Sequence, residues 1–397
     1  MKIAICGEVY SPNLGDGVIA HSLAWLFNYV NSKADISFLD FEARTNYNIS
    51  SDIISSSSNV FRVFHRKFSN FSSYRKIMFA LRWYLYKRKK LNAFWRKEII
   101  DTDLVVIGGG QLLMDNDLVF PFKIHQLVAT AANLDKSIVF YGCGVGSHWS
   151  SYGLSLIRSA LLNKNVQGIY LRDYGSCCAL KKICPEIRSK IHLTIDPALF
   201  ASEAFKIASP KQSYVIGLGL ASPMVLQRHS FEDKKYLHKE VVKQFWIDLV
   251  SYLRARHNKV IFFTNGAIED QKFAQEVISN INENERFSAT LLPRPLKPET
   301  LVDYISNCNA IVAHRLHANI IAYSLDKPFV ALGWDKKVLD FGKMVGLSEF
   351  FVEPSNLNSE LVYERLERGI VSEKDITIKD ELKKMSIQYI SNILGNC

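Results

Sequence analysis

The stretch AIVAHRLHANIIAYSLDKPFVALGWDKK, residues 310–337, decides the fold class. Its first four residues are apolar, which is typical of a strand buried in a parallel sheet, and a helical pattern follows over residues 318–325. A second apolar strand is expected at residues 328–332. Strands that alternate with helices in this way predict an α/β fold.

Ionisable side chains follow both strands at the point where each one ends. His314, Arg315 and His317 follow the first strand, and Lys336 and Lys337 follow the second. Open α/β sheets bind ligands outside the carboxyl ends of their strands, where helix N-termini attract anions. Because like charges repel unless an anion compensates them, the pattern predicts a site for a small, doubly anionic ligand. The alternative is that the arginine and the two histidines belong to a salt-bridge network between domains.

Length and composition indicate two domains in a cytoplasmic protein. A chain of 397 residues is too long for one ordinary core, and its 48% of apolar residues supply two. The seven cysteines show neither metal-ligand spacing nor a disulfide pattern, so we expect a reducing compartment and no metal site. The chain begins in a strand rather than a signal peptide, and no apolar run is long enough to span a membrane.

The first strand ends in a loop that carries Asn13, Gly15 and Asp16, ahead of a helix over residues 18–30. Gly15 lets the backbone approach a ligand, and Asn13 lies in the same loop. Asp16 is either a helix cap or a general base.

Two further glycine-rich segments follow strands expected at residues 103–107 and 137–141. Gly109 and Gly110 belong to the first, where backbone N–H groups can contact phosphate or sugar. The second is followed by His148, which either faces the same ligand or is incidental.

Arg172 adds a cation at another strand end. It follows a strand over residues 166–171 and precedes a helix that Asp173 or Ser176 can cap.

The order of these elements predicts two Rossmann-like domains that face a central cleft, with a ligand bound between them. The first domain is expected at residues 1–205 and the second at residues 206–375. A C-terminal helix is expected over the remainder, residues 376–397.

The net charge of +10 comes from an insertion in the first domain, residues 53–97, which holds 12 Lys or Arg and no Asp or Glu. Within residues 74–97, apolar residues recur at helical spacing: Ile77, Leu81, Tyr84, Leu85, Leu91 and Trp95. A basic amphipathic helix rich in aromatic residues suits an anionic membrane surface, such as the inner face of the cytoplasmic membrane. The alternatives are a helix packed on its domain with solvated cations and a nucleic-acid patch. No nucleic-acid-binding motif occurs elsewhere in the sequence, so we expect no nucleic-acid partner.

An ordered set of short motifs over residues 3–347 resembles the polysaccharide pyruvyl transferase family. The motifs are Asn13-x-Gly15-Asp16, Gly108-Gly109-Gly110-x-Leu112-Leu113, Gly142-x-Gly144-x-Gly146, Arg172-Asp173-x-x-Ser176, Asp196-Pro197, Arg315-Leu316-His317-Ala318, Lys327-Pro328 and Asp335-x-Lys337. The basic insertion lies outside the shared pattern, as does His314.

The resemblance implies a fold like that of GT-B glycosyltransferases. It also implies transfer of a pyruvyl group from phosphoenolpyruvate to two hydroxyls of one sugar, which forms a cyclic ketal. The acceptor would be a polysaccharide or lipid-linked glycan precursor of a capsule, exopolysaccharide or other cell-envelope polymer. By the same resemblance Arg172, Arg315 and Leu316 would hold phosphoenolpyruvate, and His317 would sit at the chemistry.

The residues suit this chemistry on independent grounds. Phosphoenolpyruvate carries a phosphate and a carboxylate, for which Arg172 and Arg315 offer bidentate forks and Lys336 or Lys337 a point charge. His317 can act as general acid or base, and Asp16 is the best carboxylate for a sugar hydroxyl. The scheme needs no cofactor or metal besides phosphoenolpyruvate as co-substrate.

Two other functions fit the same pattern. One is a nucleotide-sugar-dependent glycosyltransferase of GT-B fold, whose site would also accept a diphosphate. The other is a non-catalytic glycan-binding protein of the same fold.

Overall fold

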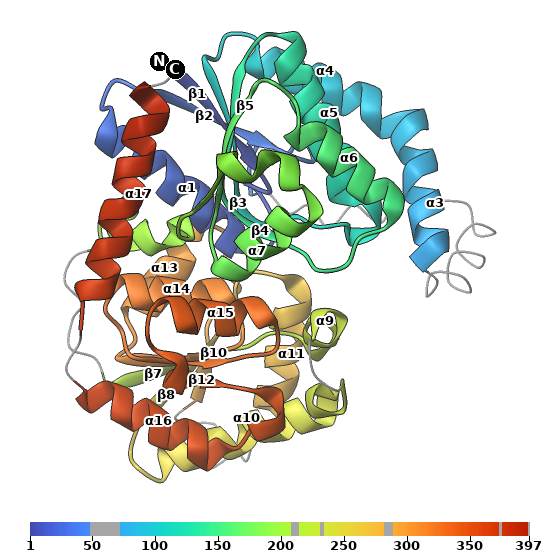
Figure 1. Cartoon of the computed structure of the whole chain (residues 1–397). Coiled ribbons are helices and arrows are strands. Elements are labelled where there is room, and N and C mark those ends of the chain that lie inside the picture. The colour runs from blue at the N-terminus through green and yellow to red at the C-terminus, as the bar shows by residue number, and fades with distance from the viewer. Residues whose placement is uncertain (48–71, 208–213, 231–233, 282–288, 373–374, 396–397) are drawn as a thin grey trace. The chain divides into compact units, whose positions relative to one another are not determined.

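The computed structural model describes residues 1–47, 72–207, 214–230, 234–281, 289–372 and 375–395. The chain forms two compact units. Unit 1 contains Met1–Tyr10, Asn31–Asp196 and Asn392–Cys397, and unit 2 contains Ser11–Val30 and Pro197–Ser391. Each unit is built on a six-stranded parallel sheet, so the predicted fold class is confirmed (Figure 1).

The sheet of unit 1 has the strand order β2-β1-β3-β4-β5-β6. Its strands are β1 (Lys2–Gly7), β2 (Asp35–Asp40), β3 (Leu104–Leu113), β4 (Ser137–Val145), β5 (Val166–Leu171) and β6 (Ile191–Leu193). The chain starts at the second position of this order, and the direction of winding reverses between β2 and β3, as in doubly wound folds. The carboxyl ends of β1, β3, β4 and β5 therefore lie along one edge.

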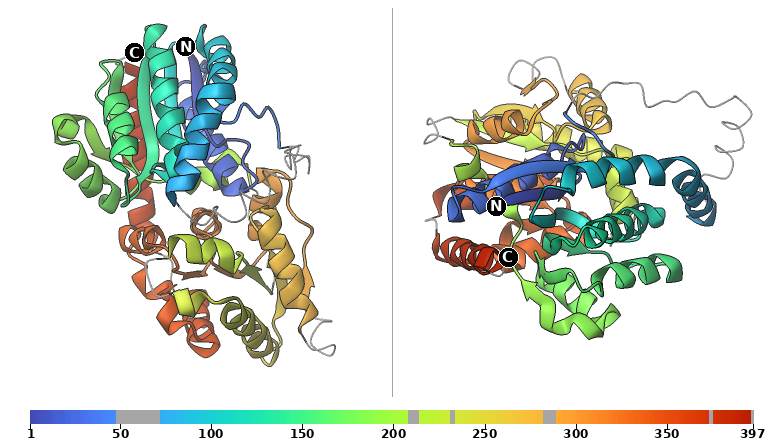
Figure 2. Two further views of the ribbon diagram at one scale, coloured as in Figure 1. Left: turned by 90° about the vertical axis from the view of Figure 1, so that its right-hand side faces the viewer. Right: turned by 90° about the horizontal axis from the view of Figure 1, so that it is seen from above.

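Three helices of unit 1 lie side by side along its sheet, as Figures 1 and 2 agree: α4 (Arg88–Ile99), α5 (Val119–Asn133) and α6 (Ser151–Leu161). The turn before α5 holds η2 (Asn116–Leu118), and α7 (Tyr174–Ile183) and η3 (Pro185–Lys190) also belong to this unit. Runs of Val and Ile in the strands account for the buried sheet, since a strand covered on both faces is apolar throughout.

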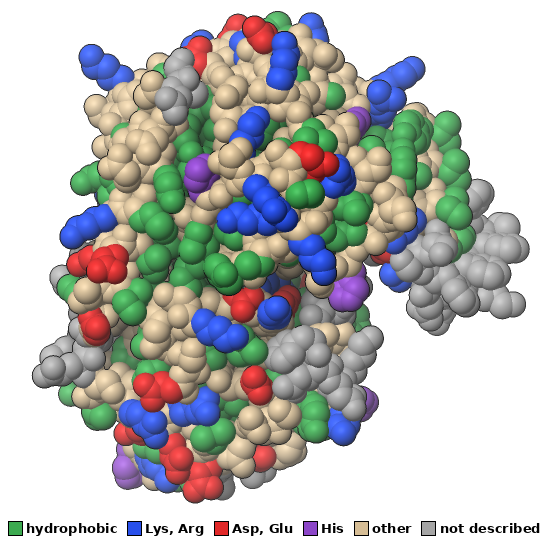
Figure 3. Space-filling view, viewed as in Figure 1, with side chains coloured by type: hydrophobic (Ala, Val, Ile, Leu, Met, Phe, Trp, Pro, Cys, Tyr) green, Lys and Arg blue, Asp and Glu red, His purple; other side chains and the backbone are tan. Residues whose placement is uncertain are grey.

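The described part of the basic insertion, from residue 72 on, forms one long helix with an irregular middle. α3 (Ser72–Arg82) passes through a π-helical turn, η1 (Trp83–Lys87), into α4. A π-turn holds one residue more than an α-turn, so it rotates all later residues by about 100°. Figure 3 shows hydrophobic side chains exposed over α3, with Lys and Arg side chains nearby.

Because of this rotation, the helix does not have the single apolar face that the sequence predicts. Leu91 and Trp95 are buried in the core, whereas the four apolar residues before them in the pattern are exposed: Ile77, Leu81, Tyr84 and Leu85. Trp83, which precedes the extra residue, is buried on the same side as Leu91. The expectation of a constant 100° per residue is therefore wrong at the π-turn. Residues 53–71 of the insertion lie outside the described residues.

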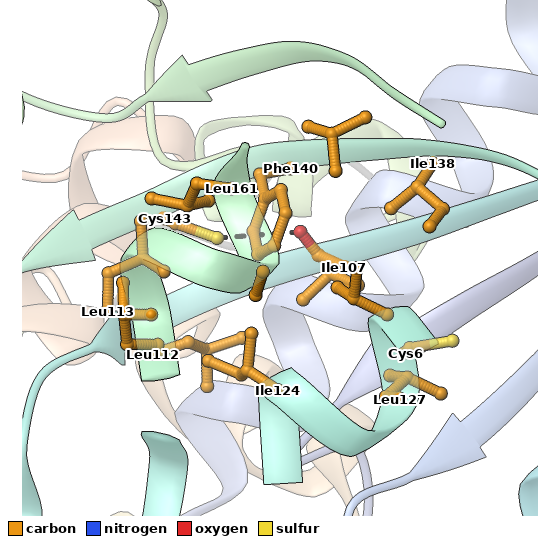
Figure 4. Packing of buried hydrophobic residues seen from close by; sticks show 14 of the residues in the cluster. Cys6, Ile107, Leu112, Leu113, Ile124, Leu127, Ile138, Phe140, Cys143 and Leu161 are labelled. Carbon is orange, nitrogen blue, oxygen red and sulfur yellow. Dashed lines mark hydrogen bonds between the residues drawn. The ribbon is translucent and has the colours of Figure 1, made fainter. Parts of the chain in front are cut away.

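One apolar cluster forms the core of unit 1. Figure 4 shows part of it between β3, β4 and α5, including Ile107, Ile124, Phe140 and Cys143. The thiol of Cys143 points across the sheet to the carbonyl of Ile107, at 3.4 Å. Burial raises the pKa of this thiol to about 12, so it stays protonated and acts as a small apolar group.

Two strands of unit 1 are longer than the sequence indicates. β3 continues through its three glycines to Leu113, and β4 continues to Val145, although both were expected to end before their glycines. Gly109 and Gly110 have φ values of 78° and 74°, and the pairing of the two strands shifts register between Gly110 and Leu113. Glycine adopts positive φ without strain, so the strands bulge here instead of ending.

The sheet of unit 2 has the order β12-β11-β10-β7-β8-β9. Its strands are β7 (Val215–Gly219), β8 (Lys259–Phe263), β9 (Ala289–Leu291), β10 (Ala310–Ala313), β11 (Phe329–Leu332) and β12 (Phe351–Val352). In Figure 1 the strands lie between a layer with α13 (Pro298–Ser306), α14 (Leu316–Ser324) and α15 (Lys336–Met344) and a layer with α10 (Lys239–Arg254) and α16 (Ser359–Val371). The βαβ unit expected at residues 310–337 is therefore present.

Further helical elements complete unit 2. They are η4 (Pro197–Phe200), α8 (Ala201–Ala204), α9 (Pro223–His229), η5 (Lys234–Leu237), α11 (Ile268–Ser279), η6 (Ser348–Phe350), η7 (Pro354–Asn356) and most of the long α17 (Thr377–Gly395). No helix among the described residues is both long enough and apolar enough to cross a membrane.

The first helix of the chain, α1 (Leu14–Val30), belongs to unit 2 although its flanking strands belong to unit 1. It packs against η4, α8, α13 and α14. The sequence-based boundary at residue 205 assigns this helix to the first domain, and sequence order gives no sign of its actual neighbours. This placement brings residues 11–13 and the first turn of α1 to the carboxyl edge of the unit 2 sheet.

Candidate functional site

The predicted site in unit 2 is built where β10 gives way to α14. Arg315 is the N-cap residue of α14, with extended φ and ψ values of −74° and 125°, and its side chain does not cap the helix. The last strand residue, Ala313, is fully buried, so the strand end is fixed by the core. The first turn of α14 consequently presents its N-terminus at the edge of the sheet, a position that favours anions.

Arg315 is held in place by a carboxylate that the sequence did not single out. Its Nε and Nη2 atoms both donate to Oδ2 of Asp270, at 3.0 and 2.7 Å. The Asp270 side chain is fully buried, and its Oδ1 accepts from the backbone N–H of Ser222 at 2.8 Å. Burial raises the pKa of Asp270, while the Arg315 guanidinium opposes that shift. The pair fixes the direction of the guanidinium and leaves its remaining donors for a ligand.

His317 lies against the first turn of α1. A Cβ atom on Gly15 would lie 2.6 Å from Cβ and Cγ of His317 and closer still to Nδ1, so no larger residue fits at position 15 without displacing the ring. A second contact of this turn is backbone to backbone: the N–H of Leu14 donates to the carbonyl of Asn265 at 2.8 Å. Residues far apart in sequence thus meet at one sheet edge.

Asp16 follows directly in the first turn of α1. Its Oδ2 accepts from Nδ2 of Asn13 at 3.3 Å, and its backbone N–H donates to the Asn13 carbonyl at 3.1 Å. Asn13 and Asp16 therefore order each other within the loop. The Asp16 residue stays partly exposed, and a general base has to be accessible to the group it deprotonates.

A polar group at the end of β8 completes this edge. Asn265 is 1% exposed, and neither its Oδ1 nor its Nδ2 has a hydrogen-bond partner among the described residues. Gly266 follows with φ +98°, and its carbonyl accepts from Nη1 of Arg294 at 3.0 Å. A buried amide without partners costs about 1–3 kcal/mol, so Asn265 is suited to a ligand that supplies them.

His314 is a core residue. It is 1% exposed, its ring lies edge-on to Trp246, and neither ring nitrogen has a partner among the described residues. Burial lowers its pKa to about 3, and the neighbouring Arg315 acts in the same direction. A neutral ring packed on Trp246 does not suit the predicted role in holding an anion.

The two lysines after β11 differ from each other. Nζ of Lys337 lies 3.1 Å from Oδ2 of Asp335 and 5.1 Å from the centre of the Trp334 ring. Trp334 in turn donates from Nε1 to the carbonyl of His314 at 2.7 Å, which ties the end of β11 to the end of β10. Lys336 is exposed.

Unit 1 positions Arg172 at the carboxyl end of β5. Its Nη1 donates to Oδ2 of Asp196 at 2.9 Å, and both side chains are buried. The guanidinium lies beside Gly144, where a Cβ would come within 3.0 Å of it. Asp173 caps α7 by accepting from the N–H of Ser176 at 2.6 Å, as the sequence predicts. Three of the motifs quoted from the sequence are therefore in contact at one edge of unit 1.

The remaining predicted residues are also in unit 1. Gly109 and Gly110 lie within the bulged part of β3 rather than in a loop beyond it. His148 is exposed, and its Nδ1 lies 2.8 Å from the hydroxyl of Ser147. Their predicted contact with an acceptor sugar stays a prediction, as do the predicted ligand contacts of Arg172 and Arg315.

Protein carboxylates compensate three of the predicted cations, so an anionic ligand is not needed to balance them. Asp270 pairs with Arg315, Asp335 with Lys337 and Asp196 with Arg172. Asp270 was not predicted because it lies 45 residues before its partner, on α11, with no motif around it. The described residues contain no group of His, Cys, Asp and Glu able to hold a metal ion.

Comparison with known proteins assigns the chain to a family. The family model for polysaccharide pyruvyl transferase matches residues 13–336, which is most of the chain. The chain belongs to the polysaccharide pyruvyl transferase family. The match begins at Asn13, in the loop beside His317, and ends at Lys336, so it includes both of the motifs that meet in unit 2. No curated protein matches the sequence.

Solved structures confirm the GT-B-like fold for this member of the family. UDP-GlcNAc 2-epimerase from Methanocaldococcus jannaschii is similar over 100% of both chains, with a TM-score of 0.59 and 12% identity. The UDP-GlcNAc 2-epimerase from Neisseria meningitidis bound to UDP-GlcNAc is similar over 99% of this chain and 100% of its own, with a TM-score of 0.54 and 12% identity. At these identities the likeness concerns the fold alone.

Proposed function

We propose that the protein transfers a pyruvyl group from phosphoenolpyruvate to two hydroxyls of one sugar in a polysaccharide precursor, forming a cyclic ketal. The observation that carries this proposal is the meeting of Gly15 and His317, because it joins two segments of the family match that are far apart in the sequence at one strand edge. Asp16 lies in the first turn of α1, Arg315 is the N-cap of α14, and Asn265 follows the neighbouring strand β8.

Arg315 and the N-terminus of α14 would bind one anionic group of phosphoenolpyruvate. Asp270 holds Nε and Nη2, so Nη1 and the N–H groups of the first helical turn remain to face a phosphate or carboxylate. Because Asp270 already neutralises the guanidinium, Arg315 would contribute oriented hydrogen-bond donors to the ligand more than a net positive charge. Lys337, after the neighbouring strand, would bind the second anionic group.

The reaction balances with two proton acceptors. The methylene carbon of phosphoenolpyruvate gains a proton and becomes a methyl group, and the bond between C2 and the phosphate oxygen breaks. Both sugar hydroxyl oxygens bond to C2 and lose their protons. Of the two protons lost by the hydroxyls, one is balanced by the proton that the methyl group gains, and the other leaves with inorganic phosphate. His317 and Asp16 are the groups at this edge that we assign to moving these protons.

Ligand-induced stabilisation tests the first step. A ligand that binds only the folded protein raises its melting temperature, so phosphoenolpyruvate should stabilise this protein and UDP should not. UDP is the matched control because a structural neighbour is bound to UDP-GlcNAc. Stabilisation by UDP alone would favour the nucleotide-sugar alternative.

A variant pair locates that binding. Arg315→Lys keeps the positive charge next to Asp270 but loses the planar guanidinium that can donate two parallel hydrogen bonds. The increase in melting temperature caused by phosphoenolpyruvate should therefore become much smaller. Arg368→Gln is the control, since Arg368 is an exposed arginine of the same unit paired with Glu349 on the surface. An unchanged shift in Arg315→Lys would remove Arg315 from the site.

A further inference from the structure

The helix formed by α3, η1 and α4 has two separate apolar faces. One is buried: Trp83, Leu91, Trp95 and Ile99 lie in the core of unit 1, and Trp83 packs on Phe122 of α5. Trp83 and Leu91 are separated by about two full helical turns, because one of the two turns between them is a π-turn. Their side chains therefore point in the same direction. The π-turn therefore keeps this buried face continuous from η1 into α4.

The other face is apolar and exposed. Ile77, Leu81 and Leu85 follow one another at i, i+4 spacing and are 60%, 50% and 65% exposed. Tyr86 beside them is 74% exposed. A helix needs only one apolar face to pack on its domain, and this helix already has that face in Trp83 and Leu91. The exposed stripe is thus additional to what the fold requires.

Some cations of the helix hold it to unit 1. Lys87 binds Glu42, Arg75 binds Asp117, and Nζ of Lys76 lies 3.6 Å from Oδ1 of Asp115. These side chains fasten the helix along its length and are not available to a partner.

Other cations of the helix face solvent beside the stripe. Arg82, Lys89 and Lys90 are exposed and form no ion pair with any described residue. Lys89 continues the i, i+4 spacing of Leu81 and Leu85. Figure 3 shows the hydrophobic side chains over α3 with Lys and Arg side chains close to them.

We propose that this stripe, Ile77, Leu81, Leu85 and Tyr86 flanked by Arg82, Lys89 and Lys90, docks the protein on the surface of an anionic lipid bilayer. Aliphatic and aromatic side chains enter the boundary between headgroups and acyl chains, and lysine and arginine bind the anionic headgroups. The charge of the segment fits such a partner, since residues 53–97 contain no carboxylate that anionic lipid would repel. The proposal does not depend on the reaction proposed for unit 2.

Vesicle binding tests the docking surface with the full chain. The protein should sediment with vesicles of phosphatidylcholine and phosphatidylglycerol, should bind less at high salt, and should not sediment with phosphatidylcholine alone. The triple variant Arg82→Gln, Lys89→Gln, Lys90→Gln should bind the anionic vesicles about a hundredfold more weakly. The triple variant Ile77→Ser, Leu81→Ser, Leu85→Ser should also lose binding.

Matched controls separate the stripe from general surface properties. Lys272→Gln with Lys384→Gln removes exposed charge from unit 2, and Val371→Ser removes an apolar side chain that is 78% exposed there. Neither control should change vesicle binding. All variants should keep the wild-type melting temperature, because the altered side chains do not contribute to the core.

Two results would overturn the proposal. One is unchanged vesicle binding in both triple variants. The other is a wild-type protein that is dimeric in solution and a serine variant that is monomeric but still binds vesicles, which would make the stripe an interface between copies of the chain.

Discussion

At the scale of single residues, the contact between Gly15 and His317 is the most constrained point of the site. It involves a glycine that has no room for a side chain and a ring at the start of a helix. The sequence suggested a reason for Gly15, close approach to a ligand, but the structure gives another: close approach to the imidazole. The two reasons are compatible, because a ring pressed against backbone has a fixed orientation.

Gly15→Ala should therefore disturb catalysis more than folding. The added Cβ would overlap the ring, so we expect a loss of about 1–3 kcal/mol in unfolding free energy. Displacing a catalytic group by about 1 Å lowers a rate by about a hundredfold, and pyruvyl transfer should fall by at least that factor. Transfer rates and urea denaturation measure the two effects. Gly395→Ala is the control, because a Cβ there meets nothing within 4 Å; an active, stable Gly15→Ala protein would refute the contact.

His314 gives a prediction of pH dependence. Its pKa is about 3 when folded and 6.5 in the unfolded reference, so between these values only the unfolded state binds the proton. Protonation then favours unfolding, and stability that is present above pH 6.5 is lost as the pH falls. At pH 5 the expected loss is about 2 kcal/mol relative to pH 7. His314→Phe should abolish this loss.

The same variant separates packing from ligand binding. Both ring nitrogens of His314 lack partners among the described residues, so a phenyl ring packed on Trp246 in its place breaks no side-chain hydrogen bond. We expect His314→Phe to keep pyruvyl transfer near the wild-type rate. Urea denaturation at low and neutral pH, with a rate measurement at neutral pH, checks both statements. Equal pH dependence in the two proteins would show that His314 is not the titrating group.

At this scale, the sequence predicted which type of residue lies at each strand end. It placed Arg172, Arg315 and His317 correctly at the carboxyl ends of β5 and β10 because apolar runs end abruptly there. It could not supply their partners. Asp270 and Asp196 are separated from the arginines by 45 and 24 residues, and only the tertiary fold makes them neighbours.

At the scale of elements, a buried lysine ties α5 to the strand ends of unit 1. Lys123 is 1% exposed, and its Nζ lies 3.1 Å from Glu8 and 2.7 Å from Glu42. Burial alone would raise the pKa of Glu42, but Lys123 and then Lys87 lower it to about 2. The π-turn contains Lys87, so the network also fastens this turn to the segment just after β2 in the same unit.

Lys123→Met should destabilise unit 1 strongly. Removing one partner of a buried ionic network leaves the others without compensation, at a cost of about 3–5 kcal/mol. The double variant Lys123→Met, Glu42→Gln should recover part of that loss, since it removes the stranded charge. Urea denaturation of the wild type and both variants gives the differences. If Lys123→Met alone unfolds at the wild-type urea concentration, the network has no structural role.

The extents of the elements show where sequence patterns stop being informative. Apolar runs located the strands, but β3 and β4 extend through their glycines because positive φ and a shift of register allow pairing to continue. The π-turn has no sequence signature: one extra residue is accommodated because Trp83 and Leu91 both gain burial. A constant helical period therefore placed Leu91 and Trp95 on the same face as Ile77 and Leu81, whereas the structure has them on the buried face.

At the scale of the whole molecule, the two parallel sheets and their helices follow from alternating apolar and amphipathic segments. The assignment of α1 to unit 2 does not, because nothing local distinguishes a helix that returns to its own sheet from one that packs elsewhere. That assignment matters for the proposed function, since it brings Asn13, Gly15 and Asp16 to the edge that carries His317.

The proposed function requires this edge of unit 2 to perform pyruvyl transfer from phosphoenolpyruvate. The most direct measurement is incubation of the protein with phosphoenolpyruvate and a panel of glycans, including lipid-linked ones, followed by mass spectrometry and phosphate determination. We predict a glycan whose mass increases by pyruvic acid less one water, with one inorganic phosphate released per transfer. His317→Asn should lose this activity, and His257→Asn, at an exposed residue with φ +63°, should keep it. Full activity in His317→Asn, or transfer of a sugar from UDP-GlcNAc in place of a pyruvyl group, would contradict the account.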